Sequence, residues 1–117
     1  MIIGSGAAGL MAALSAAPSC EVVLVTDRAV GRSNTVMAQG GLQLPEGTVE
    51  SREGFVADML ASARVPVDEQ RVRAFAEAVG ETVGQLVAWG LALLVDADGE
   101  PLRRIAGGMR APRVVNT

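Results

Sequence analysis

Three glycines near the start of the chain have the spacing of a nucleotide-binding turn. Gly4, Gly6 and Gly9 form the pattern G-x-G-x-x-G directly after two isoleucines. In such a turn the first glycine allows a tight bend, the second lets a pyrophosphate approach the backbone, and the third lets a helix pack closely on a strand. The pattern therefore predicts a site where N–H groups at a helix N-terminus bind phosphate.

The residues around this turn have the order expected of a strand–helix–strand unit. Ala7–Ala17 is rich in alanine and leucine, which favour a helix, and Pro18 ends it. Val22–Val25 has the length and β-branched character of a strand. Thr26 and Asp27 follow about 20 residues after the glycines, where an acidic side chain accepts from a ribose hydroxyl. The unit could serve only to pack a helix on a strand, but the order of all its parts favours nucleotide binding.

A segment of small and polar residues follows the second predicted strand. Ser33–Gly41 carries no charged side chain, unlike an ordinary surface loop, and it ends in two adjacent glycines. Adjacent glycines let a flat ligand approach the backbone closely. We therefore expect this segment to be buried and to line a ligand.

The composition excludes several kinds of site. The 117 residues contain no histidine and a single cysteine, and the ten basic residues are all arginine. Ser-His-Asp triads, histidine metal sites, P-loop lysines and internal disulfides are therefore excluded. A net charge of −3 argues against nucleic-acid binding, and no apolar run is long enough to span a bilayer. We expect a cytoplasmic protein in which Cys20 is a small buried side chain.

Two helices are predicted in the second half of the chain. Thr48 caps a helix from Glu50 to Ala63, and Asp68 caps a longer one that Gly90 ends. Both show apolar residues three and four positions apart, which is typical of core packing. These residues are Phe55, Met59 and Leu60 in the first helix, and Val72, Phe75, Val79, Val83, Leu86 and Val87 in the second.

A hairpin and a basic tail are predicted to follow. Leu91–Val95 and Leu102–Ile105 have the character of strands, with the turn signal Asp98-Gly99 between them. The tail contains arginines and no acidic residue after Glu100. It is either a solvated basic face or a patch that attracts an anion, since the arginine fork matches a carboxylate.

Two blocks of sequence are more specific than the glycines alone. They are Ile3–Leu10, and Arg32–Gly41 with the sequence R-S-N-T-V-M-A-Q-G-G. Together they resemble the FAD-binding start of the fumarate reductase/succinate dehydrogenase flavoprotein family, which includes L-aspartate oxidase. The resemblance implies an α/β fold class: a Rossmann-like FAD-binding βαβ unit, then the start of a helical capping insertion with a β-hairpin, forming an incomplete domain. Residues 1–47 would belong to the FAD-binding domain, and residues 48–117 to the helical segment and capping region.

The resemblance also implies which residues hold the cofactor. Ser5–Ala8 would contact the pyrophosphate, Thr26 and Asp27 the adenosine ribose, and Asn34–Gly41 the isoalloxazine side. No catalytic residue or metal ligand is expected in this chain, and the catalytic residues would lie beyond Thr117. The expected cofactor-binding residues are Gly4, Ser5, Gly6, Ala7, Ala8, Gly9, Thr26, Asp27, Ser33, Asn34, Thr35, Ala38, Gln39, Gly40 and Gly41.

Two departures from the family pattern bear on function. Asn34 stands where the covalent members have the histidine that bonds to the flavin, so the resemblance implies non-covalent FAD. Gly107 and Gly108 match a G-G segment that leads toward the dicarboxylate site, but Met109 and Arg110 replace the family's His-Ser. We expect Gly107, Gly108 and Arg110 on the substrate side of the flavin.

The implied activity is hydride transfer between FAD and a small dicarboxylate or amino acid. L-Aspartate oxidase is one specific alternative; the glycine turn alone also fits a nicotinamide-dependent dehydrogenase fragment or a non-catalytic nucleotide-binding module. The implied partners are a small acid substrate, the remaining part of the flavoprotein and an electron-transfer subunit. Because Met1–Ile3 is short for a buried strand, we expect a fragment that folds poorly alone.

Overall fold

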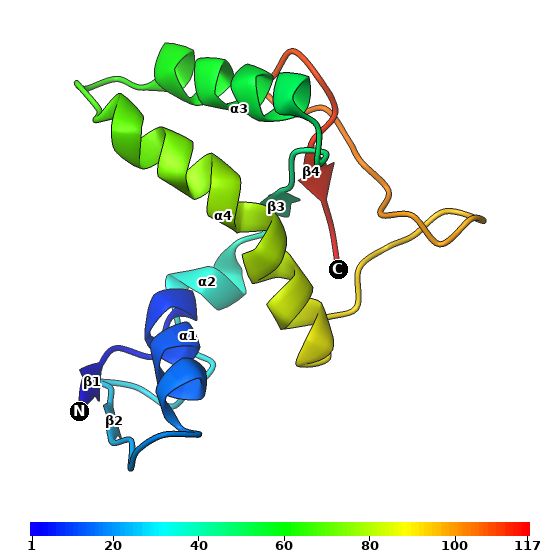
Figure 1. The fold of residues 1–117 in the computed structure, drawn as a ribbon. Coiled ribbons are helices and arrows are strands. Elements are labelled where there is room, and N and C mark those ends of the chain that lie inside the picture. Colours follow the sequence, from blue (N-terminus) through cyan, green and yellow to red (C-terminus); the bar gives the residue numbers. More distant parts are fainter. The chain divides into compact units, whose positions relative to one another are not determined.

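A computed structural model describes all 117 residues of the chain as a mixed α/β structure (Figure 1). Contacts divide the chain into two compact units, Met1–Gln39 (unit 1) and Gly40–Thr117 (unit 2). The elements in chain order are β1 (Ile2–Ile3), α1 (Ala7–Ala16), β2 (Leu24–Val25), α2 (Asn34–Met37), β3 (Leu42–Gln43), α3 (Val49–Ser62), α4 (Glu69–Ala88) and β4 (Val114–Val115).

Unit 1 contains the predicted strand–helix–strand arrangement. Strand β1 pairs in parallel with β2, and Ile2 lies opposite Leu24. Helix α1 connects the two strands, as the sequence predicted. The turn needs its glycines: Gly4 has φ +101°, and a Cβ on Gly9 would lie 1.9 Å from the Gly4 carbonyl oxygen. At position 9 there is therefore no room for a side chain larger than the hydrogen of glycine.

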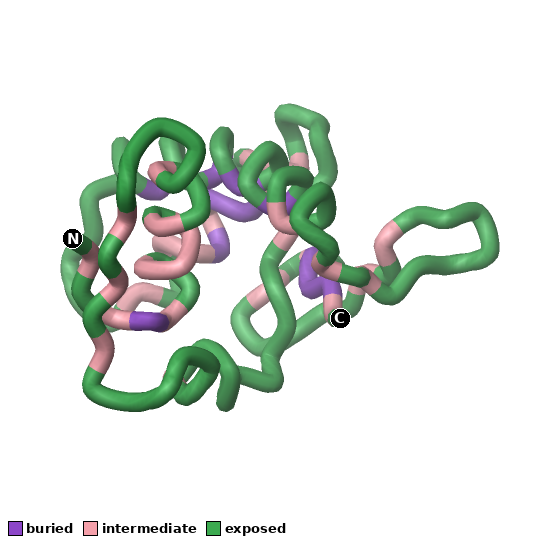
Figure 2. Tube along the Cα trace, turned by 90° about the horizontal axis from the view of Figure 1, so that it is seen from below, coloured by how far each residue is buried: buried purple, intermediate pink, exposed green.

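Unit 1 buries very little of its own apolar surface. Ser5 is its one buried residue, and α1 buries none of its side chains (Figure 2). Leu14 on α1 is 50% exposed and Ile3 on β1 is 78% exposed. Helix α1 is apolar around its whole circumference, a pattern typical of a helix surrounded by protein.

Two expectations of burial in unit 1 are wrong. Cys20 is exposed, because it lies in the turn after α1 and not in β2, and its Sγ donates to the Ala16 carbonyl at 3.5 Å. Residues 34–41 are exposed, and Ser33 is half-buried. Part of this segment forms the four-residue helix α2 on the surface of unit 1, where Met37 is 78% exposed.

Helices α3 and α4 form the core of unit 2. Phe55 and Val56 from α3 pack with Val72 and Ala76 from α4, and Met59 and Leu60 cover this cluster. The rings of Phe55 and Phe75 stack with centroids 6.0 Å apart. The predicted apolar face of α3 is therefore the face that packs.

Both helices begin at the predicted capping residues. The Thr48 side chain accepts from the Ser51 N–H at 3.1 Å, and the Asp68 carboxylate accepts from the Gln70 N–H at 2.9 Å. These bonds satisfy backbone donors that lack a partner within the helix. At the other end, α4 stops before Gly90, which has φ +103°.

The apolar stripe of α4 is partly different from the prediction. Val72, Val79 and Val83 are buried as expected. Phe75 is 52% exposed and Val87 is 45% exposed, and Ala76 occupies a buried position instead. Ala76 packs in the cluster between α3 and α4, whereas Phe75 stacks on Phe55 and stays half-exposed.

The predicted hairpin has the correct turn but not the predicted strands. Asp96 Oδ1 accepts from the Asp98 and Glu100 N–H groups, and Gly99 has φ +85°. The flanking segments share a single isolated bridge, between Val95 and Pro101. Leu91–Val95 and Leu102–Ile105 are therefore not regular strands.

These segments lack a strand ladder because the tail of the chain takes their hydrogen bonds. Leu94 donates to the Asn116 carbonyl at 2.8 Å, and Arg104 donates to the Val114 carbonyl at 2.8 Å. The tail itself forms β4, which the sequence did not predict, and β4 pairs antiparallel with β3. Val115 on β4 is fully buried.

Candidate functional site

Unit 1 contains a pocket of about 610 Å³ beside the glycine turn. It lies where β1 and β2 end, and the loop that carries α2 completes it. Parallel α/β units bind ligands at the carboxyl ends of their strands. The lining residues are Ser5, Thr26, Asp27, Arg28, Gly31, Arg32, Ser33, Asn34, Val36 and Met37.

A hydrogen bond joins the two strand ends at the pocket. The hydroxyls of Ser5 and Thr26 lie 3.0 Å apart, and Ser5 is buried. Both residues were predicted to contact the cofactor, and 20 positions of sequence separate them because α1 lies between. The parallel pairing of β1 and β2 brings them together.

A second hydrogen bond joins the α2 loop to the glycine turn. The Ala7 N–H, the first of α1, donates to Thr35 Oγ1 at 3.1 Å. Gly6 provides no side chain to cap α1, and a Cβ there would lie 3.6 Å from the same oxygen. Thr35 therefore caps α1 from 28 residues away in sequence.

One hydroxyl in the pocket wall has no partner. Ser33 Oγ is buried and makes no hydrogen bond within the chain. Because an unpaired buried hydroxyl costs free energy, it favours a ligand that can hydrogen-bond to it. The pocket thus combines one unpaired hydroxyl group with the N-terminus of α1, an arrangement that can bind a polar, anionic ligand.

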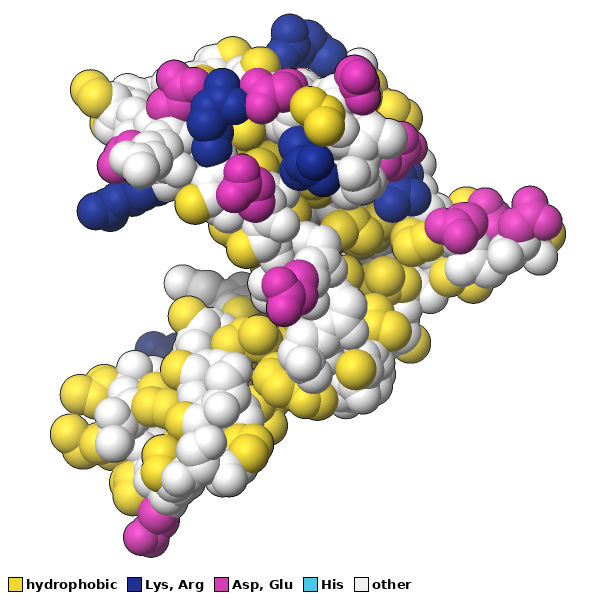
Figure 3. Space-filling model, in the orientation of Figure 1, with side chains coloured by type: hydrophobic (Ala, Val, Ile, Leu, Met, Phe, Trp, Pro, Cys, Tyr) yellow, Lys and Arg dark blue, Asp and Glu magenta, His cyan; other side chains and the backbone are white.

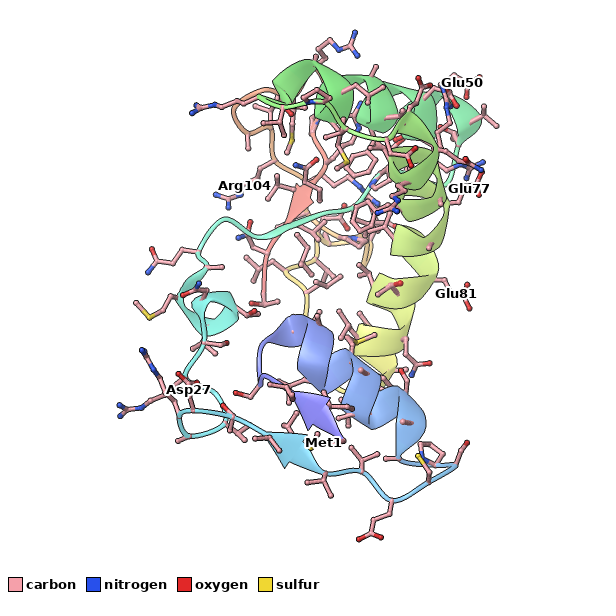
Figure 4. The ribbon with its side chains drawn as sticks, turned by 90° about the vertical axis from the view of Figure 1, so that its left-hand side faces the viewer. Met1, Asp27, Glu50, Glu77, Glu81 and Arg104 are labelled. Atoms are coloured by element: carbon pink, nitrogen blue, oxygen red, sulfur yellow. The ribbon has the colours of Figure 1, made fainter.

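The pocket also contains charged residues that sequence reasoning missed. Arg28 and Arg32 line it beside Asp27, and Arg28 Nε lies 3.5 Å from Asp27 Oδ2. Figure 4 shows Asp27 in the loop that follows β2. The signal available was Arg32 directly before the uncharged Ser33–Gly41 segment, with Arg28 four residues earlier.

Of the fifteen predicted cofactor residues, five line this pocket and ten do not. The ten are Gly4, Gly6, Ala7, Ala8, Gly9 and Thr35 in or beside the glycine turn, and Ala38, Gln39, Gly40 and Gly41 further along the chain. Ala38 and Gln39 are exposed and end unit 1, whereas Gly40 and Gly41 belong to unit 2. Gly41 has φ +83°, and a Cβ there would lie 2.5 Å from the Val115 carbonyl oxygen. Gly41 is therefore required for the close approach of β3 and β4.

The tail residues predicted for the substrate side lie against α3. A Cβ on Gly108 would be 3.8 Å from Ser62 Cβ at the end of that helix. Arg110 makes an ion pair with Asp58 of α3, with Nε 2.5 Å from Oδ1. Arg103 donates to the Pro101 carbonyl at 3.3 Å, and Arg104 donates to the Asn116 side chain beside β4 (Figure 4).

Sequence reasoning missed Asp58, the most strongly perturbed titratable group in the structure. The Arg110 backbone N–H, together with the Arg113 and Arg110 guanidinium groups, holds the pKa of Asp58 well below its usual range. Asp58 was hard to find because it occupies a polar-looking position inside an amphipathic helix. Only the tertiary fold brings Arg110 and Arg113 to it across more than 50 residues.

Comparison with known proteins assigns the family. The family described as FAD binding domain matches residues 1–117, the whole of the chain. The chain belongs to this FAD-binding domain family. Because all 117 residues fall within the match, both units are part of it.

The relatives of this FAD-binding chain are flavoproteins of the resembled kind. It is 36% identical over 116 residues to the 8-methylmenaquinol:fumarate reductase flavoprotein subunit of Wolinella succinogenes, covering 92% of the chain and 18% of the relative. It is 38% identical over 100 residues to the L-aspartate oxidase of Mesorhizobium japonicum, covering 85% of the chain and 19% of the relative. The chain thus spans about a fifth of the length of these relatives.

Solved structures show the same similarity. The E. coli quinol fumarate reductase FrdA, solved with an E245Q mutation, superposes with a TM-score of 0.89 and 31% identity, over 97% of this chain and 20% of that one. Sdh1 of Mycobacterium smegmatis superposes with a TM-score of 0.86 and 27% identity, over 96% of this chain and 19% of that one. No helix of the chain has the length and apolar character needed to cross a membrane.

Proposed function

We propose that this chain is the FAD-binding portion of a flavin-dependent oxidoreductase of the fumarate reductase/succinate dehydrogenase type. In the complete protein a hydride passes between FAD and a small dicarboxylate or amino acid. The observation that carries the proposal is the pocket beside the glycine turn, in a chain that matches the FAD-binding domain family throughout. FAD supplies the redox chemistry when bound, and the protein binds and orients it.

The lining of the pocket supports this assignment. The N–H groups at the start of α1 and the positive end of its dipole favour the pyrophosphate, and Gly6 leaves the backbone accessible. Thr26 and Asp27 follow β2, where they can accept from the ribose hydroxyls. The unpaired hydroxyl of Ser33 gains a partner if the cofactor lies against the α2 loop.

We propose further that the FAD is held without a covalent bond. The resembled covalent members use a histidine where this chain has Asn34, and the chain contains no histidine. An amide side chain is not a nucleophile toward the flavin. Asn34 lines the pocket, where its amide can donate and accept hydrogen bonds.

The domain assignment also stays a proposal. Residues 1–47 would form the N-terminal part of the FAD-binding domain, and residues 48–117 the helical segment and capping region. The division by contacts falls after Gln39, which places β3 in the second unit because β3 pairs with β4. We also propose a cytoplasmic location and an electron-transfer subunit as partner of the complete flavoprotein.

L-Aspartate oxidase is the second candidate activity. It is supported by the 38% identity to the enzyme of Mesorhizobium japonicum, compared with 36% and 32% identity to two fumarate reductase flavoprotein subunits. Both activities need the same FAD-binding portion. The residues that make the enzyme select L-aspartate or fumarate as substrate are not expected within this chain.

The experiment uses the complete flavoprotein that carries this chain. The purified protein is denatured in acid and separated from small molecules, and we expect FAD in the soluble fraction with none on the polypeptide. Fumarate reduction by a reduced viologen dye is then compared with oxidation of L-aspartate by dioxygen. A protein without flavin, or with flavin but inactive on both acids, contradicts the proposed function; flavin bound to the polypeptide contradicts non-covalent binding.

A further inference from the structure

The two arginines of unit 1 both lie at the pocket beside the glycine turn. Arg28 and Arg32 are the only basic side chains in residues 1–39, and both line the pocket. The acidic residues of the unit are Glu21 and Asp27, of which Asp27 lines the pocket. The ionisable side chains at the pocket therefore carry a net positive charge, although the whole chain has a net charge of −3.

The backbone of Arg28 is anchored to the ends of both strands. Its N–H donates to Thr26 Oγ1 at 3.4 Å, and the hydroxyl of Thr26 lies 3.0 Å from that of the buried Ser5. Ser5 comes shortly after β1, and Thr26 comes directly after β2. The backbone of Arg28 is therefore held at the carboxyl ends of the strands, where the pocket lies.

The side chain of Arg28 is free to turn toward a ligand. Its Nε lies 3.5 Å from Asp27 Oδ2, and the side chains of Arg28 and Asp27 are 72% and 86% exposed. An ion pair with this exposure contributes little to stability and holds neither side chain firmly. A ligand that binds Asp27 therefore finds the Arg28 guanidinium beside it and able to move.

Unit 1 has no aromatic ring on which a purine can stack. The aromatic residues of the chain are Phe55, Phe75 and Trp89, and all three belong to unit 2. Among the side chains that line the pocket, the arginine guanidinium is the largest planar group. A guanidinium packs face to face on an aromatic ring system, and its charge is attracted to the π-electrons.

We propose that Arg28 binds the adenine of FAD by stacking its guanidinium on the face of the purine. The inference rests on the proposed function, in which the pocket holds FAD with its adenosine ribose at Asp27. Adenine is bonded directly to that ribose, so the residue next to Asp27 is the one placed to reach the ring. The Asp27 carboxylate then binds the sugar while Arg28 covers the base.

Arg32 lies at the other end of a short turn and has a different position along the site. Its N–H donates to the Ala29 carbonyl at 3.0 Å, and Gly31 between them has φ +89°. Arg32 directly precedes the segment in which Thr35 accepts from the Ala7 N–H at the glycine turn. This order assigns Arg32 to the proposed pyrophosphate side, where charge matters more than stacking.

The test measures ligand affinity of the apoprotein prepared from the complete flavoprotein. We expect Arg28→Ala to raise the dissociation constants of FAD and of ADP about 5-fold to 10-fold, because both ligands carry the adenine. Flavin fluorescence measures the binding of FAD, and isothermal titration calorimetry measures the binding of ADP. ADP lacks the flavin, so an equal effect on both ligands assigns the contact to their shared adenosine diphosphate half.

Two further substitutions separate stacking from charge. Arg28→Tyr keeps a planar group without the charge, so it should retain most of the affinity for ADP. Arg28→Lys keeps the charge without the plane, so its affinity for ADP should lie near that of Arg28→Ala. The reverse order would show that Arg28 attracts the pyrophosphate by its charge, and it would overturn the proposal.

Arg71→Ala is the matched control. Arg71 on α4 forms an equally loose pair, with its Nε 3.4 Å from Asp68 Oδ2, and its side chain is 88% exposed. It belongs to unit 2 and does not line the pocket. We expect this variant to bind FAD and ADP with wild-type affinity. Equal weakening in Arg71→Ala and Arg28→Ala would trace the effect to the net charge of the protein and overturn the proposal.

The outcomes distinguish this inference from the proposed function. If the wild-type apoprotein binds no FAD, the proposed function fails. If it binds FAD, but Arg28→Ala binds FAD and ADP as tightly as the wild type, only the role of Arg28 fails. Because Arg28 is largely exposed, its replacement should leave the urea-unfolding midpoint of the apoprotein unchanged. Failure of the Arg28 variants to fold would make Arg28 a structural residue and also overturn the proposal.

Discussion

At the scale of single residues, the structure depends on polar side chains that connect distant segments. Thr35 caps α1 from the α2 loop, and Asp58 binds the tail to α3. In both cases a side chain satisfies backbone N–H groups that local structure leaves free. Such bonds contribute little net free energy when made, but their loss leaves a polar group unpaired.

Removal of the Thr35 hydroxyl should weaken cofactor binding. Thr35→Val keeps the shape of the side chain but removes the acceptor of the Ala7 N–H, so the α2 loop is no longer joined to the glycine turn. A hydrogen bond of this kind contributes about 0.5–1.5 kcal/mol, so we expect the FAD dissociation constant to rise roughly 3-fold to 10-fold. This dissociation constant is measured by titrating the apoprotein with FAD and recording the flavin fluorescence.

The control for Thr35 is Thr82 on α4. Its hydroxyl donates to the Ala78 carbonyl within the same helix at 3.0 Å, far in sequence from the pocket residues. Thr82→Val should leave FAD affinity unchanged, and Thr35→Ser should retain most of it. Wild-type affinity in Thr35→Val would show that the cap from Thr35 does not contribute to binding.

Asp58 should make stability depend on pH in the acid range. Its pKa is lowered in the folded protein, so the carboxylate stabilises the fold fully above about pH 5, where it is ionised in both states. This contribution is lost as the pH falls below about 4 toward the lowered pKa. The stability difference between wild type and Asp58→Asn should therefore be constant above about pH 5 and shrink below about pH 4.

Urea unfolding of the complete flavoprotein at a series of pH values measures this difference. Glu53→Gln serves as the control, because its pair with Arg73 is on the surface, where such pairs contribute little to stability. A wild-type advantage over Asp58→Asn that stays constant or grows below about pH 4 would contradict the assignment.

At the scale of elements, different interactions hold the helices of the two units in place. In unit 1 the glycine turn sets how closely α1 lies on β1, whereas in unit 2 apolar packing between α3 and α4 forms a core. The same substitution, glycine to alanine, should therefore have opposite effects in the two units. A pair of glycines makes this comparison possible.

Gly9→Ala should disrupt the turn of unit 1. The new Cβ would lie 1.9 Å from the Gly4 carbonyl oxygen, and this neighbour is backbone that cannot rotate away. Forced overpacking costs about 1–3 kcal/mol or more, and the displaced α1 can no longer present its N–H groups to phosphate. We expect reduced stability and loss of bound FAD, measured by unfolding and by the flavin content of the purified flavoprotein.

Gly80→Ala in α4 is the matched control. A Cβ at Gly80 meets no atom within 4 Å, and the residue is exposed in the middle of a helix. Alanine there should stabilise the helix by about 0.5–1 kcal/mol. A Gly9→Ala protein with normal flavin content would argue against the close packing of α1 on the turn.

At the scale of the whole molecule, the chain exposes more surface than its mass requires. Its accessible surface is 8,325 Å². A compact protein of 12.0 kDa exposes about 6,000 Å², and two separate compact units of these lengths would expose roughly 7,100 Å² together. Figure 3 shows hydrophobic side chains across the visible face of unit 1, which has no buried apolar residue. This surface needs a partner to bury it.

We therefore expect the isolated chain to fold poorly. The apolar side chains of unit 1 gain nothing from folding if they stay in water, so the entropy cost of ordering the unit is not offset. The purified 117-residue chain should show no cooperative thermal transition by differential scanning calorimetry. A sharp transition without any added protein would show that the two units are stable by themselves.

The sequence by itself determined the local features and the family. The glycine turn, α1, the caps at Thr48 and Asp68 and the end of α4 all depend on neighbouring residues, so their patterns can be read directly. The Arg32–Gly41 block pointed to the flavoprotein family that the comparisons then showed.

Only the tertiary structure decided the contacts between distant segments. Leu94 and Arg104 of the predicted hairpin donate to carbonyl groups of the tail. Ala76 packs in the core between α3 and α4, and Asp58 binds Arg110 and Arg113. The physical reason is the same in each case. A backbone or carboxylate group takes whichever partner the fold brings within bonding distance, and sequence spacing does not encode that distance.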